Sequence, residues 1–148
     1  TSYLIREALA ERRPAIFNTT DCKRDYIYVD DLMQYLFRMA FSDKKYRAEV
    51  FNLATGNAYS ALEIARTVYK ILGKDFNFDK GDPLKFWDKY ETLFNQKHNL
   101  NRQRVVQEVF KHCLGDGSKV RKEFDYKPAT NLKEGLQSII EYQKNNKT

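Results

Sequence analysis

The amino-acid sequence predicts an α/β fold built from short strands and several helices, and three observations support this prediction. Segments rich in β-branched and aromatic residues alternate with segments whose apolar residues recur at helical spacing. Residues 84–114 are mainly helical in pattern, interrupted near Asn99, so the fold is expected to be less regular than a doubly wound sheet. The chain has 148 residues, of which 42% are hydrophobic, which predicts a single domain over residues 1–148.

The first elements are expected to be a helix followed by two strands. Residues 3–11 carry apolar side chains at helical spacing, and Pro14 ends this helix. A short strand is predicted over residues 15–17. Residues 25–29 are β-branched and aromatic, so they are predicted to form the second strand.

The next helix and strand follow from a capping signal and an apolar run. Asp30 or Asp31 is expected to cap a helix that starts at Leu32, because a carboxylate can accept hydrogen bonds from the free N–H groups of the first turn. Residues 49–54 have the composition of a buried strand and are predicted to be one.

Capping signals also define the third helix. Ser60 and Glu63 have the spacing of a capping box, in which each side chain accepts a hydrogen bond from the other residue's backbone N–H. The helix that follows is expected to end at Gly73. Residues 76–78 are predicted to form one more short strand.

The carboxyl-terminal part is predicted to contain two further helices. Ser118 is expected to cap a short helix that ends near Phe124, and Asn131 is expected to cap a final helix. The apolar residues expected on one face of that final helix are Leu132, Leu136, Ile139 and Ile140.

Composition argues against several classes of function. The net charge is +6, but the 26 basic residues are interleaved with 20 acidic ones, so we do not expect nucleic-acid binding. No apolar run approaches the roughly 20 residues of a membrane span, and no signal peptide is recognisable. Cys22 and Cys113 are distant in sequence, and neither they nor His98 and His112 have metal-ligand spacing. We therefore expect free thiols, no metal and a reducing, cytoplasmic setting.

Three segments carry a more specific pattern. Residues 24–32 read Arg-Asp-Tyr-Ile-Tyr-Val-Asp-Asp-Leu, and residues 50–56 read Val-Phe-Asn-Leu-Ala-Thr-Gly. Residues 115–120 read Gly-Asp-Gly-Ser-Lys-Val and precede Pro128 and a last amphipathic segment. In this order, the segments resemble the extended short-chain dehydrogenase/reductase family of NAD-dependent nucleotide-sugar epimerases and dehydratases.

The resemblance implies the carboxyl-terminal part of an extended Rossmann-type nucleotide-sugar enzyme. The family holds NAD on a glycine-rich turn and uses a tyrosine with a lysine four residues later. This sequence contains neither motif, so we expect no catalytic residues and no cofactor in this chain, and NAD(P) in the parent protein. The implied partners are a nucleoside diphosphate sugar, an absent amino-terminal Rossmann half and, as in the family, a second copy in a homodimer. By analogy, the pathway would be polysaccharide biosynthesis.

Arg24 and Asn52 are the main candidates for substrate binding. In the family, the arginine that matches Arg24 contacts the diphosphate, for which a guanidinium fork is suited. The alternative is that Arg24 only forms an ion pair with Asp25, Asp30 or Asp31. The resemblance places Asn52 beside the ligand, and the alternative is that its amide clamps neighbouring backbone.

Five further residues are weaker candidates. Tyr26 and Tyr28 share one face of the expected strand, and one of them could line the cleft, although core packing is the better explanation for at least one. Tyr59 could contact the sugar or base, and the alternative is simple packing. Trp87 could stack on a base or sugar, but aromatic residues at helical spacing usually belong to a core. Many relatives carry Arg-x-Gly-Asp before the position of Gly115, and this sequence does not; the nearest substitutes are Arg102 and Arg104.

Three functions remain open at this point. The chain could be the substrate-side portion of an enzyme, catalytically incomplete alone. It could be a stand-alone binding or scaffolding module of the same fold. The weakest hypothesis is a nucleic-acid binder that uses the positive charge, which salt-sensitive DNA binding would support.

Overall fold

The computed structural model describes residues 1–94 and 101–146. The fold is α/β, with short strands and several helices, as the sequence predicts. The elements in chain order are α1 (Ser2–Leu9), β1 (Ala15–Ile16), β2 (Lys23–Asp25), α2 (Val29–Ala40), β3 (Ala58–Ser60), α3 (Ala61–Leu72), β4 (Asp79–Lys80), α4 (Pro83–Trp87), the 3-10 helix η1 (Asp88–Phe94), α5 (Arg102–Val109), α6 (Ser118–Phe124) and α7 (Leu132–Asn145). Within the described ranges, no helix is both long and apolar enough to cross a membrane.

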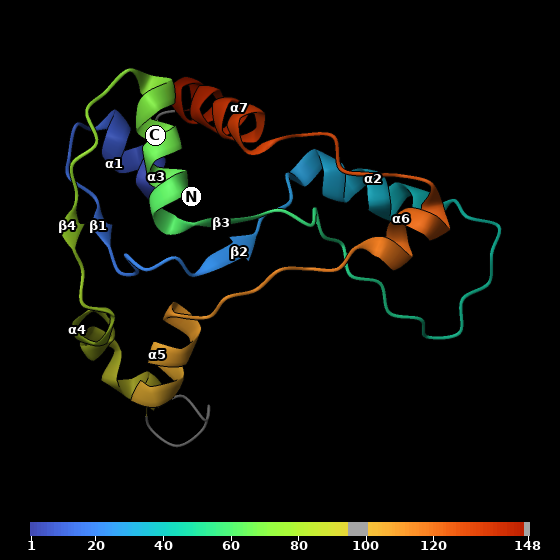
Figure 1. Ribbon diagram of the computed structural model, residues 1–148, viewed down its shortest axis with the longest axis horizontal. Coiled ribbons are helices and arrows are strands. Elements are labelled where there is room, and N and C mark those ends of the chain that lie inside the picture. The colour runs from blue at the N-terminus through green and yellow to red at the C-terminus, as the bar shows by residue number, and fades with distance from the viewer. Residues whose placement is uncertain (95–100, 147–148) are drawn as a thin grey trace.

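The elements gather into three groups (Figure 1). Helices α1, α3 and α7 pack together, and the parallel pair β1–β4 lies along their edge. The second group, which we call the arm, consists of α2, α6 and residues 41–53. The third, which we call the lobe, consists of α4, η1 and α5. The antiparallel pair β2–β3 lies between the three groups, at the centre of the molecule.

The main hydrophobic core lies between α1, α3 and α7. Each helix contributes apolar residues spaced three or four apart, which places them on one face. Burial of these side chains is the main favourable contribution to folding. The fully or nearly fully buried members are Leu4, Ile5, Ala8, Ile16, Ile64, Ala65, Val68, Tyr69, Leu136 and Ile140.

A smaller core holds the arm together. Tyr35 of α2 is completely buried, and its ring packs edge-on against Tyr126, with the ring centroids 4.9 Å apart. Val120 and Phe124 of α6 complete this cluster. Because the cluster is separate from the main core, the arm extends away from the three-helix group (Figure 1).

Two capping boxes confirm the predictions made from local sequence signals. The backbone N–H of Glu63 donates to Ser60 Oγ over 3.2 Å, and the backbone N–H of Ser60 donates to Glu63 Oε2 over 2.7 Å. Asn131 and Glu134 form the same arrangement at the start of α7. Gly73 ends α3 with a φ of 65°, a left-handed conformation that glycine adopts without steric cost.

Three strand predictions are wrong: two strands lie at other residues than expected, and the third segment is not a strand. The strand expected over 25–29 lies at Lys23–Asp25, and the one expected over 76–78 lies at Asp79–Lys80. Residues 49–54 are not a strand. A strand is defined by its backbone partner, and within the described residues no segment pairs with 49–54.

Two capping predictions are also wrong. Helix α2 begins at Val29, so Asp30 and Asp31 lie inside its first turn and neither caps it. Asp31 points inward instead and holds the residues that precede α7. Ser118 is the first residue of α6, and the carboxylate of Asp116 accepts its backbone N–H over 2.8 Å.

Candidate functional site

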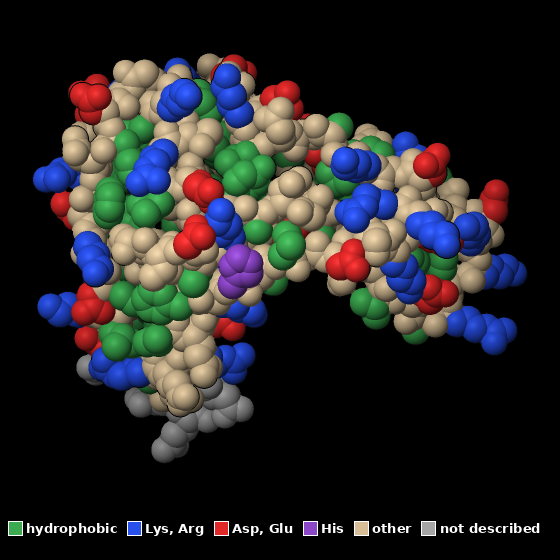
Figure 2. All heavy atoms as spheres, in the orientation of Figure 1, with side chains coloured by type: hydrophobic (Ala, Val, Ile, Leu, Met, Phe, Trp, Pro, Cys, Tyr) green, Lys and Arg blue, Asp and Glu red, His purple; other side chains and the backbone are tan. Residues whose placement is uncertain are grey.

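A cavity of about 600 Å³ lies where β2, residues 51–54 and residues 111–116 meet. Figure 2 shows that the molecule is concave between the arm and the lobe, and residues 111–116 connect these two groups (Figure 1). Both Arg24 and Asn52 line this cavity. The structure therefore brings the two main sequence candidates to one place, although 28 positions separate them in the chain.

The backbone fixes one wall of the cavity against β2. The N–H of Cys113 donates to the carbonyl of Lys23 over 2.8 Å, and the N–H of Asp25 donates to the carbonyl of Cys113 over 3.1 Å. These bonds form a parallel bridge between Arg24 and Cys113. The segment before α6 is thereby held beside Arg24.

The carboxylate of Asp25 fixes the opposite wall. Its Oδ1 accepts from the backbone N–H of Thr55 over 3.1 Å and from the Thr55 hydroxyl over 2.6 Å, and its Oδ2 accepts from the N–H of Gly56 over 2.8 Å. These contacts tie the turn that follows residues 51–54 to β2. Asp25 therefore positions the segment that carries Asn52.

Arg24 is half-buried, and its guanidinium donates to the backbone carbonyl of Glu108 in the last turn of α5. A cation at this end of a helix is favoured by the helix dipole. Among the described residues, Arg24 forms none of the ion pairs with Asp25, Asp30 or Asp31 that the alternative explanation expected, and its side chain bonds to the Glu108 carbonyl instead. Asn52 is exposed, and the hydrogen bonds of the described residues do not include its amide, which argues against a clamp.

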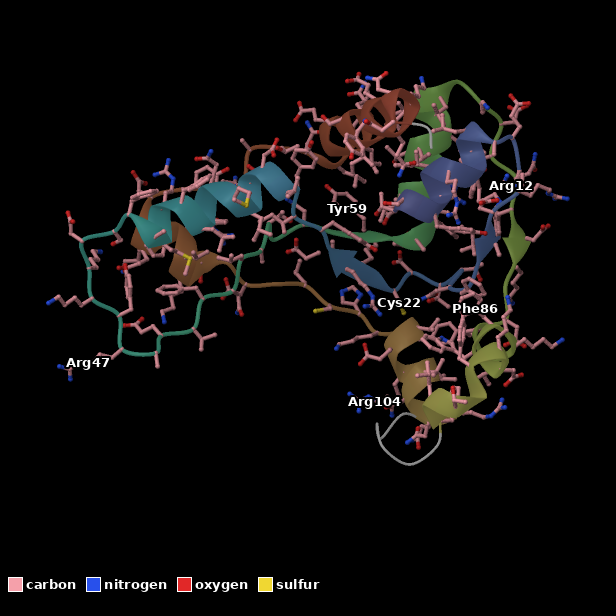
Figure 3. All side chains as sticks on the ribbon, turned by 180° about the vertical axis from the view of Figure 1, so that it is seen from behind. Arg12, Cys22, Arg47, Tyr59, Phe86 and Arg104 are labelled. Carbon is pink, nitrogen blue, oxygen red and sulfur yellow. The ribbon has the colours of Figure 1, made fainter. Side chains whose placement is uncertain are left out.

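The other five sequence candidates lie outside this cavity. Tyr26 lines a smaller cavity of about 100 Å³ beside α7, and Tyr59 packs against the main core (Figure 3). Trp87 belongs to an aromatic cluster in the lobe, 5.8 Å from the ring of Tyr90. Arg102 forms an ion pair of 2.6 Å with Asp88, and Arg104 is an exposed residue of α5 (Figure 3).

Sequence reasoning missed several residues that line the cavity. Phe51 and Leu114 give it apolar surface, and Lys111 and Asp116 give it charge. Hydrogen bonds from Ser118 hold the pKa of Asp116 below its usual value, so this carboxylate is ionised at neutral pH. The sequence signal was present, because all but Phe51 lie in the stretch around the Gly115 motif.

Glycine at position 115 is required by close packing within the wall. A Cβ built there would lie 2.4 Å from the Cβ of Ala54, which is itself buried. The backbone of residues 111–116 could not approach residues 51–54 so closely with a larger side chain.

Gly115→Ala is therefore expected to lower the free energy of unfolding by about 1–3 kcal/mol, the usual cost of overpacking. Urea denaturation measures the change. Lys122→Ala, on the exposed side of α6, serves as the control and is expected to stay within about 0.5 kcal/mol of the unchanged protein. Equal stability of the two variants would contradict the close contact.

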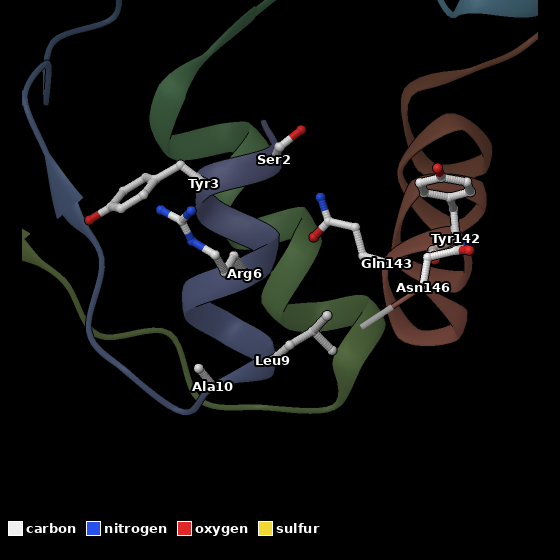
Figure 4. Close-up of a pocket in the computed structure, with 8 residues that line it drawn as sticks. All are labelled: Ser2, Tyr3, Arg6, Leu9, Ala10, Tyr142, Gln143 and Asn146. Atoms are coloured by element: carbon white, nitrogen blue, oxygen red, sulfur yellow. The ribbon is translucent and has the colours of Figure 1, made fainter. Parts of the chain in front are cut away.

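A second cavity, of about 430 Å³, lies between α1 and α7 (Figure 4). Arg6 is its cation, and the guanidinium lies 5.9 Å from the centre of the Tyr3 ring and 3.6 Å from the carboxylate of Glu7. None of the sequence candidates lines it. This cavity provides an internal comparison, because an arginine lines it as well.

Comparisons with known proteins identify the same group of enzymes in sequence and in structure. The family model described as GDP-mannose 4,6 dehydratase matches residues 1–139. UDP-glucose 4-epimerase of Lactobacillus helveticus is 36% identical over 59 residues, which are 39% of this chain and 18% of that protein.

Solved structures of such enzymes share the fold. UDP-glucuronic acid 4-epimerase from Bacillus cereus, solved with NAD, superposes with a TM-score of 0.73 at 22% identity. That match covers 97% of this chain and 38% of the epimerase. For dTDP-glucose 4,6-dehydratase from Bacillus anthracis the TM-score is 0.68 at 17% identity, with 97% and 38% covered. The chain thus spans well under half the length of these relatives.

Proposed function

Because the chain belongs to the GDP-mannose 4,6 dehydratase family, among the extended short-chain dehydrogenases/reductases, we propose that it is the nucleotide-sugar-binding portion of an NAD-dependent epimerase or dehydratase. It is catalytically incomplete alone. The observation that carries the proposal is the single cavity lined by Arg24 and Asn52. A pyrophosphate fits a guanidinium fork, and an amide can donate to and accept from a base or sugar.

The proposal assigns the redox chemistry to polypeptide outside these residues. The sequence has no tyrosine followed by lysine four residues later, and Gly115-Asp116-Gly117 lacks the third glycine of a dinucleotide motif. The two family motifs that hold NAD and transfer the proton are therefore assigned to other polypeptide of the whole protein. Solved relatives bind NAD, and one was solved with both NAD and UDP-glucuronic acid, which supports NAD in the whole protein.

The arm supports the idea of a partner domain. Helix α2 exposes a row of apolar side chains, and Phe37 and Phe41 stack with ring centroids 6.5 Å apart. Phe41 is 82% exposed and Val50, in the unpaired segment 49–54, is 78% exposed. A segment that has the composition of a strand but no strand partner among the described residues, together with a helix whose apolar face is exposed, suits docking onto the NAD-binding half.

This surface is expected to cause self-association of the chain alone. Replacing Phe37 and Phe41 with serine removes much of the apolar area, so the variant is expected to run closer to monomer size in sedimentation velocity at matched concentration. Tyr142→Ser, which changes an exposed aromatic residue of α7, is the control and should leave association unchanged. A monomeric unmodified chain at high concentration would contradict the docking surface.

Calorimetric titration with a panel of nucleoside diphosphate sugars tests the function. We expect at least one of the UDP-, dTDP- and GDP-linked sugars to bind saturably. Its affinity is expected to be lower at high salt, because the contact with the diphosphate is electrostatic. The same chain incubated with NAD and the bound sugar is expected to give no product. Absence of all binding would refute the proposal, and turnover would refute the incomplete chemistry.

A stand-alone binding or scaffolding module is the second candidate, and it shares the cavity. The two candidates differ in what they imply for the arm, because a module that acts alone does not need the exposed apolar face of α2 for docking another domain. Co-expression with a family NAD-binding half that restores turnover would favour the enzyme portion. Binding of nucleotide sugar without any such complementation would favour the module.

A further inference from the structure

The cavity contains a second cation, Lys111, which lies four residues before the Gly115 motif. Lys111 lines the cavity together with Arg24, and among the residues that the structure describes these are the two basic ones in its lining. Arg102 and Arg104, the substitutes suggested by sequence, lie outside it. We propose that Lys111 is the second diphosphate-binding cation, and that the Glu108 carboxylate pairs with Lys111 until the ligand displaces it. This inference rests on the proposed function.

The backbone explains why Lys111 faces the cavity. Lys111 and Cys113 lie two positions apart on the segment that bridges to β2, and alternate residues of an extended segment share a face. Cys113 pairs with Arg24 in that bridge, and both Lys111 and Cys113 line the cavity. The ammonium and the guanidinium are therefore presented from adjacent segments.

Glu108 contacts both cations, Arg24 through its backbone and Lys111 through its side chain. Its backbone carbonyl accepts from the Arg24 guanidinium, and its carboxylate lies 3.6 Å from Lys111 Nζ. The Lys111 and Glu108 side chains are 51% and 53% exposed, so their ion pair is weak and readily exchanged. A diphosphate carries more charge and more acceptor oxygens than this carboxylate, so it can replace Glu108 at Lys111.

The anions of the cavity are already engaged elsewhere. Both oxygens of Asp25 accept from Thr55 and Gly56, and Asp116 accepts from the backbone of Ser118. Their negative charge is partly offset by these N–H donors. The cationic groups with donor capacity at the cavity are the ammonium group of Lys111 and the remaining guanidinium N–H groups of Arg24, and the neutral amide of Asn52 lies beside them.

The exchange also links ligand binding to the lobe. Glu108 lies in the last turn of α5, and the segment that leaves α5 forms the cavity wall. When a diphosphate binds Lys111, the ion pair between Lys111 and Glu108 at the end of α5 is lost. Binding is therefore expected to release the Glu108 side chain at the carboxyl end of α5.

Titration of three variants with UDP and UDP-glucose tests the inference. Lys111→Gln is expected to weaken the affinity for both by about tenfold and to make it less sensitive to salt, as loss of one charge-assisted contact requires. Lys111→Arg is expected to retain most of the affinity. Glu108→Gln is expected to strengthen binding by about twofold to fivefold, because a competing anion is removed.

Lys44→Gln is the matched control, since Lys44 pairs with Glu123 over 2.8 Å in the arm, away from the cavity. It should bind UDP as the unchanged protein does. If the unchanged protein binds UDP and Lys111→Gln binds it equally, the role of Lys111 is refuted and the proposed function stands. If the unchanged protein binds no nucleoside diphosphate or its sugars, both are refuted.

Discussion

Asp31→Ala is expected to destabilise the protein by about 3 kcal/mol, because it leaves buried hydrogen-bond donors without an acceptor. The Asp31 side chain is almost fully buried at 3% exposure. Its carboxylate accepts the hydroxyl of Tyr126 over 2.5 Å and the backbone N–H groups of Ala129 and Thr130 over 2.9 and 3.0 Å. Alanine would leave these donors without an acceptor, and it would release the connection between the arm and α7.

Asp30→Ala is the matched control. Asp30 is the preceding residue of the same helical turn and is exposed, so its replacement is expected to change stability by less than about 0.5 kcal/mol. Thermal and urea unfolding measure both variants. Equal effects at positions 30 and 31 would show that Asp31 acts only through the helix dipole.

The same carboxylate makes stability depend on pH in a defined direction. Burial alone raises the pKa of Asp31, but the hydrogen bonds from Tyr126, Ala129 and Thr130 outweigh it and hold the pKa below its usual value. A lowered folded-state pKa contributes stability above the unfolded value, and this contribution is lost as pH falls through the folded value. We expect the free energy of unfolding to fall below about pH 4, and less steeply in Asp31→Ala.

Arg24→Ala is expected to weaken the affinity for nucleoside diphosphate sugars by roughly 10-fold to 100-fold, since a charged hydrogen bond contributes about 1.5–3 kcal/mol. The side chain lines the cavity and is held there by the Glu108 carbonyl. Arg24→Lys is expected to recover part of the loss, because an ammonium keeps the charge but cannot make the two parallel bonds of a guanidinium.

Arg6→Ala separates this effect from a general loss of positive charge. Arg6 is an exposed arginine at the cavity between α1 and α7, and its replacement removes the same charge from the other cavity. Calorimetric titration of both variants, with unfolding curves to confirm that each is folded, gives the comparison. If Arg6→Ala weakened binding as much as Arg24→Ala, the cavity of Arg24 would not be the nucleotide site.

Local sequence signals predicted most of the helices correctly. The residues that make a helix lie within four positions of one another, so Ser60, Glu63 and Gly73 specify both ends of α3 without any distant partner. The apolar spacing in α1, α3 and α7 likewise placed these helices against one core. The family resemblance was also readable from sequence, because its motifs are short and ordered along the chain.

Strand positions and side-chain partners were not predictable in this way. Residues 49–54 have the composition of a strand, but a strand exists only where a second backbone supplies its hydrogen bonds. Asp31 has a capping position by sequence, yet its partners are 95 to 99 residues away. Nothing local to Asp31 distinguishes it from Asp30.

The sequence by itself determined the α/β class and most of the helices with their caps, and it named Arg24 and Asn52 as the main candidates for substrate binding. Only the tertiary structure decided that these two side chains share a cavity, that Arg102, Arg104 and Trp87 stay outside it, and that Lys111 enters it. The physical reason is the separation along the sequence between the residues that interact. Helical spacing and capping act within one turn of the chain, whereas the cavity depends on hydrogen bonds that join β2 to residues some 30 and 90 positions further on.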